Sequence, residues 1–360
     1  MAKKHPYAGM PDYQFWKHEP AISQPETFDP VTAVSFTIGK DAPVVTAGSC
    51  FAQHVAKYLS RSGFNFLVTE TPHPIIPLAV AERFNYGAFT ARYGNVYTAR
   101  QLKQLLQRGY GLFEPIESAW RTRDGSIVDP FRPQIQEGGF VSEAELLADR
   151  QVHFQALRKA IDSMAVFVFT LGLTESWVDS RDGAVFPLAP GVAGGTFDEE
   201  RFAFKNFSVE EIVADMQWSI DFIRNRNPAV KLIVTVSPVP LNATAVDRHV
   251  FVSTTYSKAV LRVAAEQVCA NNKFCDYFPS FEIITSPYAR GEYFGPDCRE
   301  VTEKGVHHVM STFLKHYGDL TDTGQAAPTA STGADAVRRH VEKMENVMNV
   351  LCDEEQITNK

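Results

Sequence analysis

The sequence predicts an α/β protein built on a doubly wound parallel sheet. Apolar, strand-like runs alternate with amphipathic, helix-like segments between residues 44 and 316. The runs at residues 165–171 and 231–236 are almost continuously apolar, which is typical of strands buried on both faces of a parallel sheet. This alternation favours helices that cross over between parallel strands, and we find no internal repeat.

The composition is that of a globular protein with a sizeable core. Of the 360 residues 44% are hydrophobic and 21% charged, and the net charge of −7 argues against a general nucleic-acid binder. No apolar run is long enough to span a membrane, and the basic start lacks the apolar run of a signal peptide, so we expect a cytoplasmic protein. The five cysteines are scattered without zinc spacing, so we expect no metal and no other cofactor.

The elements of the predicted sheet follow in order along the chain. The first strand, at residues 44–48, leads through Ser49 into a helix that ends near Gly63, and a second strand is expected at residues 64–68. Ser142 and Ser208, each followed by a glutamate three residues later, predict capped helices. The complete set of further expected elements is helices at 99–107, 142–163, 208–225, 258–269 and 302–316, and strands at 165–171, 231–236 and 274–278.

Segments without clear period flank and interrupt this α/β domain, which we place at residues 41–318. Residues 1–40 are expected to form an extended N-terminal arm, and loop-rich insertions fall at about 110–140 and 178–207. Residues 319–335 have the composition of a linker, and residues 336–360 are expected to contain a C-terminal helix with an apolar stripe. Within the first insertion, Arg132 either binds an anionic substrate group or pairs with Asp129 or another carboxylate.

Ser49 stands at the tight turn between the first strand and the first helix. Ligands of α/β proteins bind at the carboxyl edge of the sheet, and a helix N-terminus there favours developing negative charge. From the residues alone two interpretations stay open: Ser49 caps the helix, or it is a nucleophile. Polar turns at Thr174 and Ser237 and a polar cluster from Asp297 to His308 are expected at the same edge.

Residues 48–52 read Gly-Ser-Cys-Phe-Ala, the motif that gives the GSCFA family its name. Further blocks agree with that family in the same order, at residues 169–175, 235–239, 257–258 and 277–282. The chain therefore resembles the GSCFA family, relatives of the SGNH/GDSL esterases, over roughly residues 40–316. The resemblance implies a three-layer α/β fold of the SGNH/flavodoxin-like type.

The resemblance also implies roles for individual residues. Ser49 looks like the SGNH nucleophile, and Gly87, in Asn85-Tyr86-Gly87, is similar to the oxyanion glycine of the second block. Asn85 joins it as a substrate-binding candidate. Thr174 falls where SGNH enzymes have an asparagine, so a hydroxyl would replace an amide as oxyanion donor beside the Ser49 N–H.

The final SGNH motif, Asp-x-x-His, is matched only in part. Asp297 takes the place of the aspartate, but Glu300 takes the place of the histidine. A carboxylate of ordinary pKa is a poor base for a serine hydroxyl, so His308, beside the apolar stripe of the last helix, is the candidate for a relocated base. The alternatives are that His308 is a surface residue, that Glu300 acts directly, or that the site is inactive.

These expectations describe an SGNH-like serine esterase or acyl hydrolase. Its substrate would be an O-acyl ester of a small molecule or glycan, with acetylated sugars or polysaccharide precursors implied by the resemblance. An O-acyltransferase with residues 178–207 closed over an acyl donor, and an inactive glycan- or partner-binding protein, are the alternatives. Without a G-x-S-x-G elbow an α/β-hydrolase is not indicated. No nucleic-acid or membrane partner is expected, and the C-terminal helix is a candidate dimer contact with the oligomeric state left open.

Overall fold

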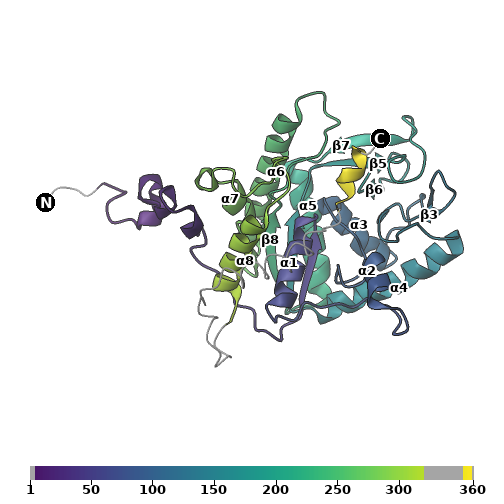
Figure 1. Cartoon of the computed structure of the whole chain (residues 1–360), viewed down its shortest axis with the longest axis horizontal. Helices are drawn as coiled ribbons and strands as arrows, with labels where there is room; N and C mark the ends of the chain where they lie inside the picture. Colours follow the sequence, from purple (N-terminus) through teal and green to yellow (C-terminus); the bar gives the residue numbers. More distant parts are fainter. Residues whose placement is uncertain (1–4, 320–351, 359–360) are drawn as a thin grey trace.

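A parallel sheet forms the centre of the chain, as the alternation of elements predicts (Figure 1). The computed structural model describes residues 5–319 and 352–358. Within these residues the central sheet has the order β1-β4-β8-β9, and all its pairs are parallel. The strands are β1 (Val44–Gly48), β4 (Val166–Leu171), β8 (Lys231–Val236) and β9 (Cys275–Tyr277).

Helices cover both faces of the sheet and give three layers. Alternate side chains of each strand point to opposite faces, and both sets are buried because nearly every strand residue is apolar or β-branched. One core packs β1, β4 and β8 against helices α3 (Ala99–Gly109), α4 (Glu143–Ser163), α5 (Val209–Arg226) and α6 (Val250–Asn271). The other packs the opposite face against helices α1 (Phe51–Arg61), α7 (Ser280–Thr285) and α8 (Glu303–Tyr317). The predicted α/β fold class is confirmed.

The helix starts predicted at Ser142 and Ser208 coincide with observed caps. The Ser142 side chain accepts a hydrogen bond from the Glu145 N–H, and Ser208 and Glu211 form a complete capping box. Helix α6 begins at Val250, eight residues before the predicted start at 258, because β-branched and polar residues hide its first turns from a periodicity reading.

The second strand, predicted at residues 64–68, is reduced to a single bridge beside β1. Phe66 pairs with Val44, and the Leu67 N–H donates to the Val44 carbonyl. Two residues further, the Thr69 N–H donates to the Thr90 carbonyl and makes no bond to β1. The chain therefore leaves the sheet after one rung, and the apolar run alone overestimates the strand.

Both predicted insertions contain antiparallel strands. The first holds the hairpin of β2 (Trp120–Arg121) and β3 (Ile127–Val128), preceded by the short helix α2 (Leu78–Arg83). The second contains most of a small sheet of order β6-β5-β7, formed by β5 (Glu175–Asp179), β6 (Val185–Phe186) and β7 (Phe202–Asn206).

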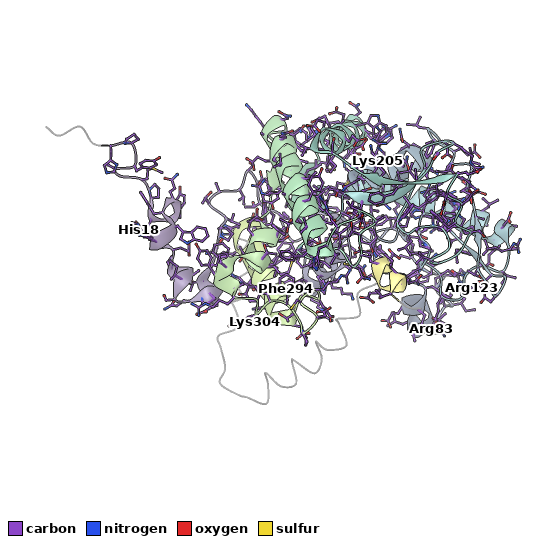
Figure 2. The ribbon with its side chains drawn as sticks, turned by 90° about the horizontal axis from the view of Figure 1, so that it is seen from above. His18, Arg83, Arg123, Lys205, Phe294 and Lys304 are labelled. Atoms are coloured by element: carbon purple, nitrogen blue, oxygen red, sulfur yellow. The ribbon has the colours of Figure 1, made fainter. Side chains whose placement is uncertain are left out.

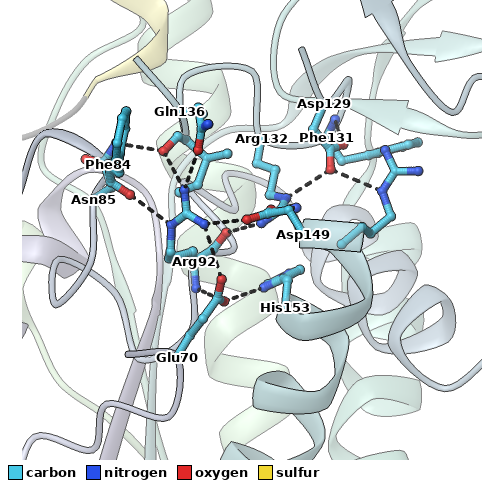
Figure 3. Close-up of polar contacts among 12 residues, drawn as sticks. Glu70, Phe84, Asn85, Arg92, Asp129, Phe131, Arg132, Gln136, Asp149 and His153 are labelled. Carbon is cyan, nitrogen blue, oxygen red and sulfur yellow. Dashed lines mark hydrogen bonds and ion pairs between the residues drawn. The ribbon is translucent and has the colours of Figure 1, made fainter. Parts of the chain in front are cut away.

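A network of buried charges holds the first insertion to α4 (Figure 3). Arg132 pairs with Asp129 at 2.9 Å and with Asp149 at 2.5 Å, so the structure favours the pairing alternative over an anion-binding role. Arg92 also pairs with Asp149, at 2.7 Å. Burial alone would raise the pKa of Glu70, but its hydrogen bond with His153 and the nearby positive charges hold that pKa at about 2.

The N-terminal arm leaves the body of the molecule as four short 3-10 turns, with His18 on the outlying part (Figures 1 and 2). The turns are η1 (Asp12–Gln14), η2 (Trp16–His18), η3 (Pro20–Ile22) and η4 (Pro25–Thr27), and η5 (Pro287–Ala289) lies near η4. The predicted linker, apart from Asp319 at its start, and the part of the predicted C-terminal helix up to residue 351 fall outside the described residues. The described C-terminal piece forms η6 (Asp353–Ile357). Among the helices described, none is long and apolar enough to cross a membrane.

Candidate active site

Ser49 follows the last residue of β1 and precedes α1 directly. Gly48 has a φ of 136°, a conformation that glycine adopts without strain, and it turns the chain from strand to helix. The Ser49 side chain is only 3% exposed, and its Oγ has no hydrogen-bond partner among the described residues. A buried hydroxyl without a partner at the positive end of a helix dipole is typical of a site that expects a ligand.

The turn after β4 lies against Ser49. A Cβ added to Gly172 would come within 2.8 Å of the Ser49 Cβ, so no larger residue fits there. Thr174, two residues further, is fully buried, and its Oγ1 also lacks a partner among the described residues. Two unpartnered hydroxyls therefore stand at the carboxyl ends of neighbouring strands.

Lys258 reaches the same turn from α6. Its Nζ donates a hydrogen bond of 2.8 Å to the Gly172 carbonyl, and only 3% of the residue is exposed. Burial lowers the pKa of Lys258 to about 8, because the ammonium loses its hydration. The preceding residue, Ser257, accepts a hydrogen bond from the Thr174 N–H at 3.2 Å. An amine that titrates near neutral pH thus contacts the same glycine as Ser49.

The segment before α3 closes over the end of β1. The Val96 N–H donates to the Gly48 carbonyl at 2.8 Å, and the Gly172 N–H donates to the Tyr97 carbonyl at 2.9 Å. Asn95 accepts a hydrogen bond of 2.9 Å from Gln53 Nε2 on α1. The side chains of Asn95 and Tyr97 are therefore fixed next to the Ser49 turn.

Residues 352–354, just before and within η6, occupy the space above this turn. Asp353 Oδ2 accepts hydrogen bonds from Asn95 Nδ2 at 2.9 Å and from Tyr97 Oη at 3.2 Å. Burial raises the pKa of Asp353 to about 6, against the effect of these two donors. The Cys352 thiol is in hydrogen-bond contact with the thiol of Cys50, the residue after Ser49.

A cleft of about 1220 Å³ opens beside η6. Gln356 and Ile357 of η6 form part of its lining, and Arg83 and Arg123 lie on the same side of the molecule (Figure 2). Glycines 191, 194 and 195 line it from the second insertion.

A model of the GSCFA family matches residues 43–313. The chain belongs to the GSCFA family. No curated protein matches its sequence significantly. The GSCFA match includes the whole central sheet and the residues around Ser49, and η6 lies outside it.

In this GSCFA protein the residues predicted for the Asp-x-x-His motif do not contact Ser49. Asp297 is exposed, and its Oδ1 accepts hydrogen bonds from the N–H groups of Arg299 and Glu300 at 3.1 and 3.0 Å. These bonds outweigh the effect of its partial burial and lower the pKa of Asp297. Glu300 is exposed as well. The motif therefore forms a local turn here.

His308 lies against the N-terminal arm. Tyr293 Oη is 2.6 Å from its Nδ1, and the Phe28 carbonyl is 2.8 Å from its Nε2. Partial burial lowers the pKa of His308, although its bond to the Phe28 carbonyl opposes this effect. Because both nitrogens are engaged, neither is available to the Ser49 hydroxyl in this arrangement.

The predicted oxyanion donors also have other surroundings. Asn85, with a φ of 58°, donates to the carbonyls of Gln134 and Ile135 and lines the large cleft. Gly87 is exposed with open space around it. The Ser49 N–H donates to the Thr170 carbonyl at 3.1 Å and extends the sheet, so it is already used. Among the predicted donors, Thr174 remains beside the Ser49 turn with a free hydroxyl.

Sequence reasoning missed Lys258 and Asn95 as site residues, although each left a signal. Lys258 falls on the apolar face of its helix, three residues before Leu261. A lysine is rarely buried there unless it has a partner, so its position indicates a specific contact. Asn95 follows Gly94 directly and stands three residues before the capping residue Thr98, a place where polar residues often meet a ligand. Among the described residues no group of histidine, cysteine, aspartate and glutamate has the geometry of a metal site.

Proposed function

We propose that this GSCFA protein is a serine acyl hydrolase of the SGNH-like kind that cleaves O-acyl esters. The observation that carries the proposal is the buried, unpartnered hydroxyl of Ser49, whose Cβ lies against Gly172, while the Gly172 carbonyl accepts a hydrogen bond from the Lys258 amine. A nucleophilic serine needs a base nearby, and Ser–Lys pairs are a known variant of the serine–histidine arrangement. Lys258 takes the role that the sequence suggested for His308 or Glu300.

The reaction begins with the neutral form of Lys258. With a pKa of about 8, roughly a tenth of the amines are uncharged at pH 7. The amine takes the Ser49 proton as Oγ adds to the ester carbonyl. The resulting ammonium returns that proton to the departing alkoxide when the ester C–O bond breaks, and an acyl-serine remains. Water then attacks the acyl-serine, Lys258 accepts its proton, and Ser49 recovers the proton as the acid leaves.

The developing oxyanion would be stabilised by Thr174 and by α1. The Thr174 hydroxyl is buried and free to donate, and the first turn of α1 supplies the positive end of a helix dipole. A hydroxyl gives a single donor, so a smaller rate enhancement is expected than with the asparagine found in SGNH enzymes.

O-acyl transfer is the second candidate function. The Ser49 side chain is 3% exposed with η6 in place, and exclusion of water from an acyl-serine favours an alcohol acceptor over hydrolysis. The cleft beside η6 has room for a glycan ester or acceptor, which keeps acetylated sugars and polysaccharide precursors as the proposed substrates.

Labelling with a fluorophosphonate probe tests the nucleophile and its base. Wild type should be labelled at a rate that rises with pH through an apparent pKa of about 8, and Ser49→Ala should abolish the signal. Lys258→Met and Lys258→Arg should each slow labelling by about a hundredfold or more, because neither accepts the serine proton. The matched control, His308→Gln, should be labelled like wild type.

Two results would contradict the proposal. Loss of labelling in His308→Gln with retention in Lys258→Met would return the base to His308. Absence of labelling in the folded chain, both with wild-type η6 and with Asp353→Ala and Glu354→Ala, would instead favour an inactive binding protein.

A further inference from the structure

The C-terminal segment covers the Ser49 turn with two buried carboxylates. We call the space that they fill, which is bordered by Asn95, Tyr97, Asn242 and Arg299, the Ser49 pocket. Asp353 is 3% and Glu354 is 5% exposed, although acidic side chains are almost never buried unless they are paired. The adjacent acidic residue, Glu355, is exposed. Of these three adjacent acidic residues, only the two whose side chains face the pocket are buried.

Each buried carboxylate has its own set of donors. Asp353 is held by Asn95 and Tyr97. Glu354 pairs with the Arg299 guanidinium at 3.0 Å and accepts a hydrogen bond from the Asn242 N–H at 3.4 Å. All these donors come from the part of the chain that matches the family, and the carboxylates come from outside it.

The donors are themselves held by the body of the protein. Gln53 fixes Asn95, and the carbonyl of Tyr97 anchors the turn at Gly172. Arg299 is positioned in the Asp297 turn, whose carboxylate receives the Arg299 N–H. This is how a preformed receptor for anionic groups is built, with donors fixed before the ligand arrives.

We propose that the pocket beside Ser49 binds a ligand with two carboxylate groups, and that Asp353 and Glu354 occupy it as an internal substitute. This inference deepens the proposed function, on which it rests in calling the ligand a substrate: it assigns the esters of dicarboxylic acids or of acidic sugars. The substitute must leave before such an ester reaches the Ser49 hydroxyl.

The occupant is held in a way that permits its displacement. Asp353 has two neutral donors and no cation within hydrogen-bond distance among the described residues, so its charge is only partly compensated. Burial accordingly raises its pKa to about 6. A ligand whose carboxylate is better stabilised by the same donors therefore binds more favourably than Asp353 and displaces it.

Disulfide trapping tests the docking without any catalysis. In the full-length chain, diamide should join Cys50 and Cys352: the two thiols lose two protons and two electrons, an S–S bond forms, and the N=N bond of diamide is reduced. The linked peptide is quantified by mass spectrometry. The pair of Cys269, near the end of α6, and Cys275, at the start of β9, has its sulfurs 3.6 Å apart and serves as an internal standard for the extent of oxidation.

Variants of the anchors should lower the trapping yield. Asp353→Ala with Glu354→Ala, and separately Arg299→Gln, should reduce the Cys50–Cys352 product about tenfold or more, because charged hydrogen bonds are lost. The matched control Glu355→Ala, an exposed neighbour of the same charge, should leave it unchanged. Equal yields in all variants would overturn the assignment of these donors, and no product in wild type would overturn the docking.

Alkylation of Cys50 in a variant that lacks both carboxylates then tests which ligands bind in the pocket. In the Asp353→Ala, Glu354→Ala chain, iodoacetamide should alkylate Cys50 about tenfold faster than in wild type. Succinate should protect that thiol, and succinamide, its neutral analogue, should not. Equal effects of the two compounds would overturn the dicarboxylate assignment.

Probe labelling separates this inference from the proposed function. Faster labelling of Ser49 in the double variant than in wild type supports both. Trapping and protection without any labelling would leave the receptor in place and refute the hydrolase. Slower labelling of the double variant would show that the acidic pair belongs to the machinery and would overturn its role as a substitute.

Discussion

Replacement of Lys258 by methionine should stabilise the protein at neutral pH and lose that advantage in alkali. The ammonium is buried, and its pKa falls from an ordinary 10.5 to about 8. Each pH unit of difference corresponds to about 1.4 kcal/mol, so the folded protein carries a cost of about 3 kcal/mol at pH 7. Methionine has a similar length and no charge to bury, and it gives up the hydrogen bond to Gly172.

The direction of the pH dependence follows from proton uptake. Between pH 8 and 10.5 the unfolded chain binds a proton at Lys258 and the folded chain does not. Stability from this group is therefore lowest below pH 8 and rises with pH up to about 10.5. Other titrating groups are common to both proteins and cancel in the difference.

Urea unfolding of the full-length chain at pH 7 and near pH 10.5 measures the effect. Wild type should gain about 3 kcal/mol relative to Lys258→Met between the two conditions. Lys273→Met, at an exposed position beyond the end of the same helix, should show no such change. A difference between wild type and Lys258→Met that does not vary with pH would refute both the buried ammonium and its use as a base.

Three further predictions concern the scaffold. Gly172→Ala should cost about 1–3 kcal/mol by overpacking and abolish probe labelling, whereas Gly39→Ala, in open space, should leave the melting temperature unchanged. Asp129→Asn should cost about 3–5 kcal/mol in urea unfolding because its arginine partners stay buried and charged, and a loss no larger than that of exposed Asp124→Asn would contradict this. Burial lowers the pKa of His153 to about 4, so its contribution to stability should fall by about 3 kcal/mol from pH 6.5 to 4, and His153→Gln should remove that part of the acid sensitivity in melts at the two pH values.

The sequence was sufficient for the four strands of the central sheet and for the sheet edge at which Ser49 and Thr174 lie. Apolar runs and caps are local signals, so β4, β8 and the starts of α4 and α5 lie where they were predicted. The parallel pairing of β1 and β4 then places Ser49 and Thr174 at neighbouring strand ends without further assumptions.

Which side chains meet at this edge depends on contacts between segments that lie far apart in the sequence. The orientation of His308 is decided by the Phe28 carbonyl, 280 residues away, because the N-terminal arm covers that face of α8. Asp353 meets Tyr97 across 256 residues. A periodicity identifies the buried side of a helix, but it does not identify which distant segment lies on the remaining side.

The buried charges between the first insertion and α4 have a consequence for how the cleft can diverge between related proteins. Arg92 is hydrogen-bonded to the carbonyls of Phe84 and Ile135, so it fixes two backbone segments that border the cleft (Figure 3). The backbone on this side of the cleft is therefore held in place by the buried Arg92 and not by the exposed lining residues. Exposed lining residues such as Arg83 and Arg123 can therefore be exchanged at little cost in folding. Surface substitutions in homologues can therefore change the chemistry of the cleft lining, while the buried ion pairs preserve the outline of the cleft.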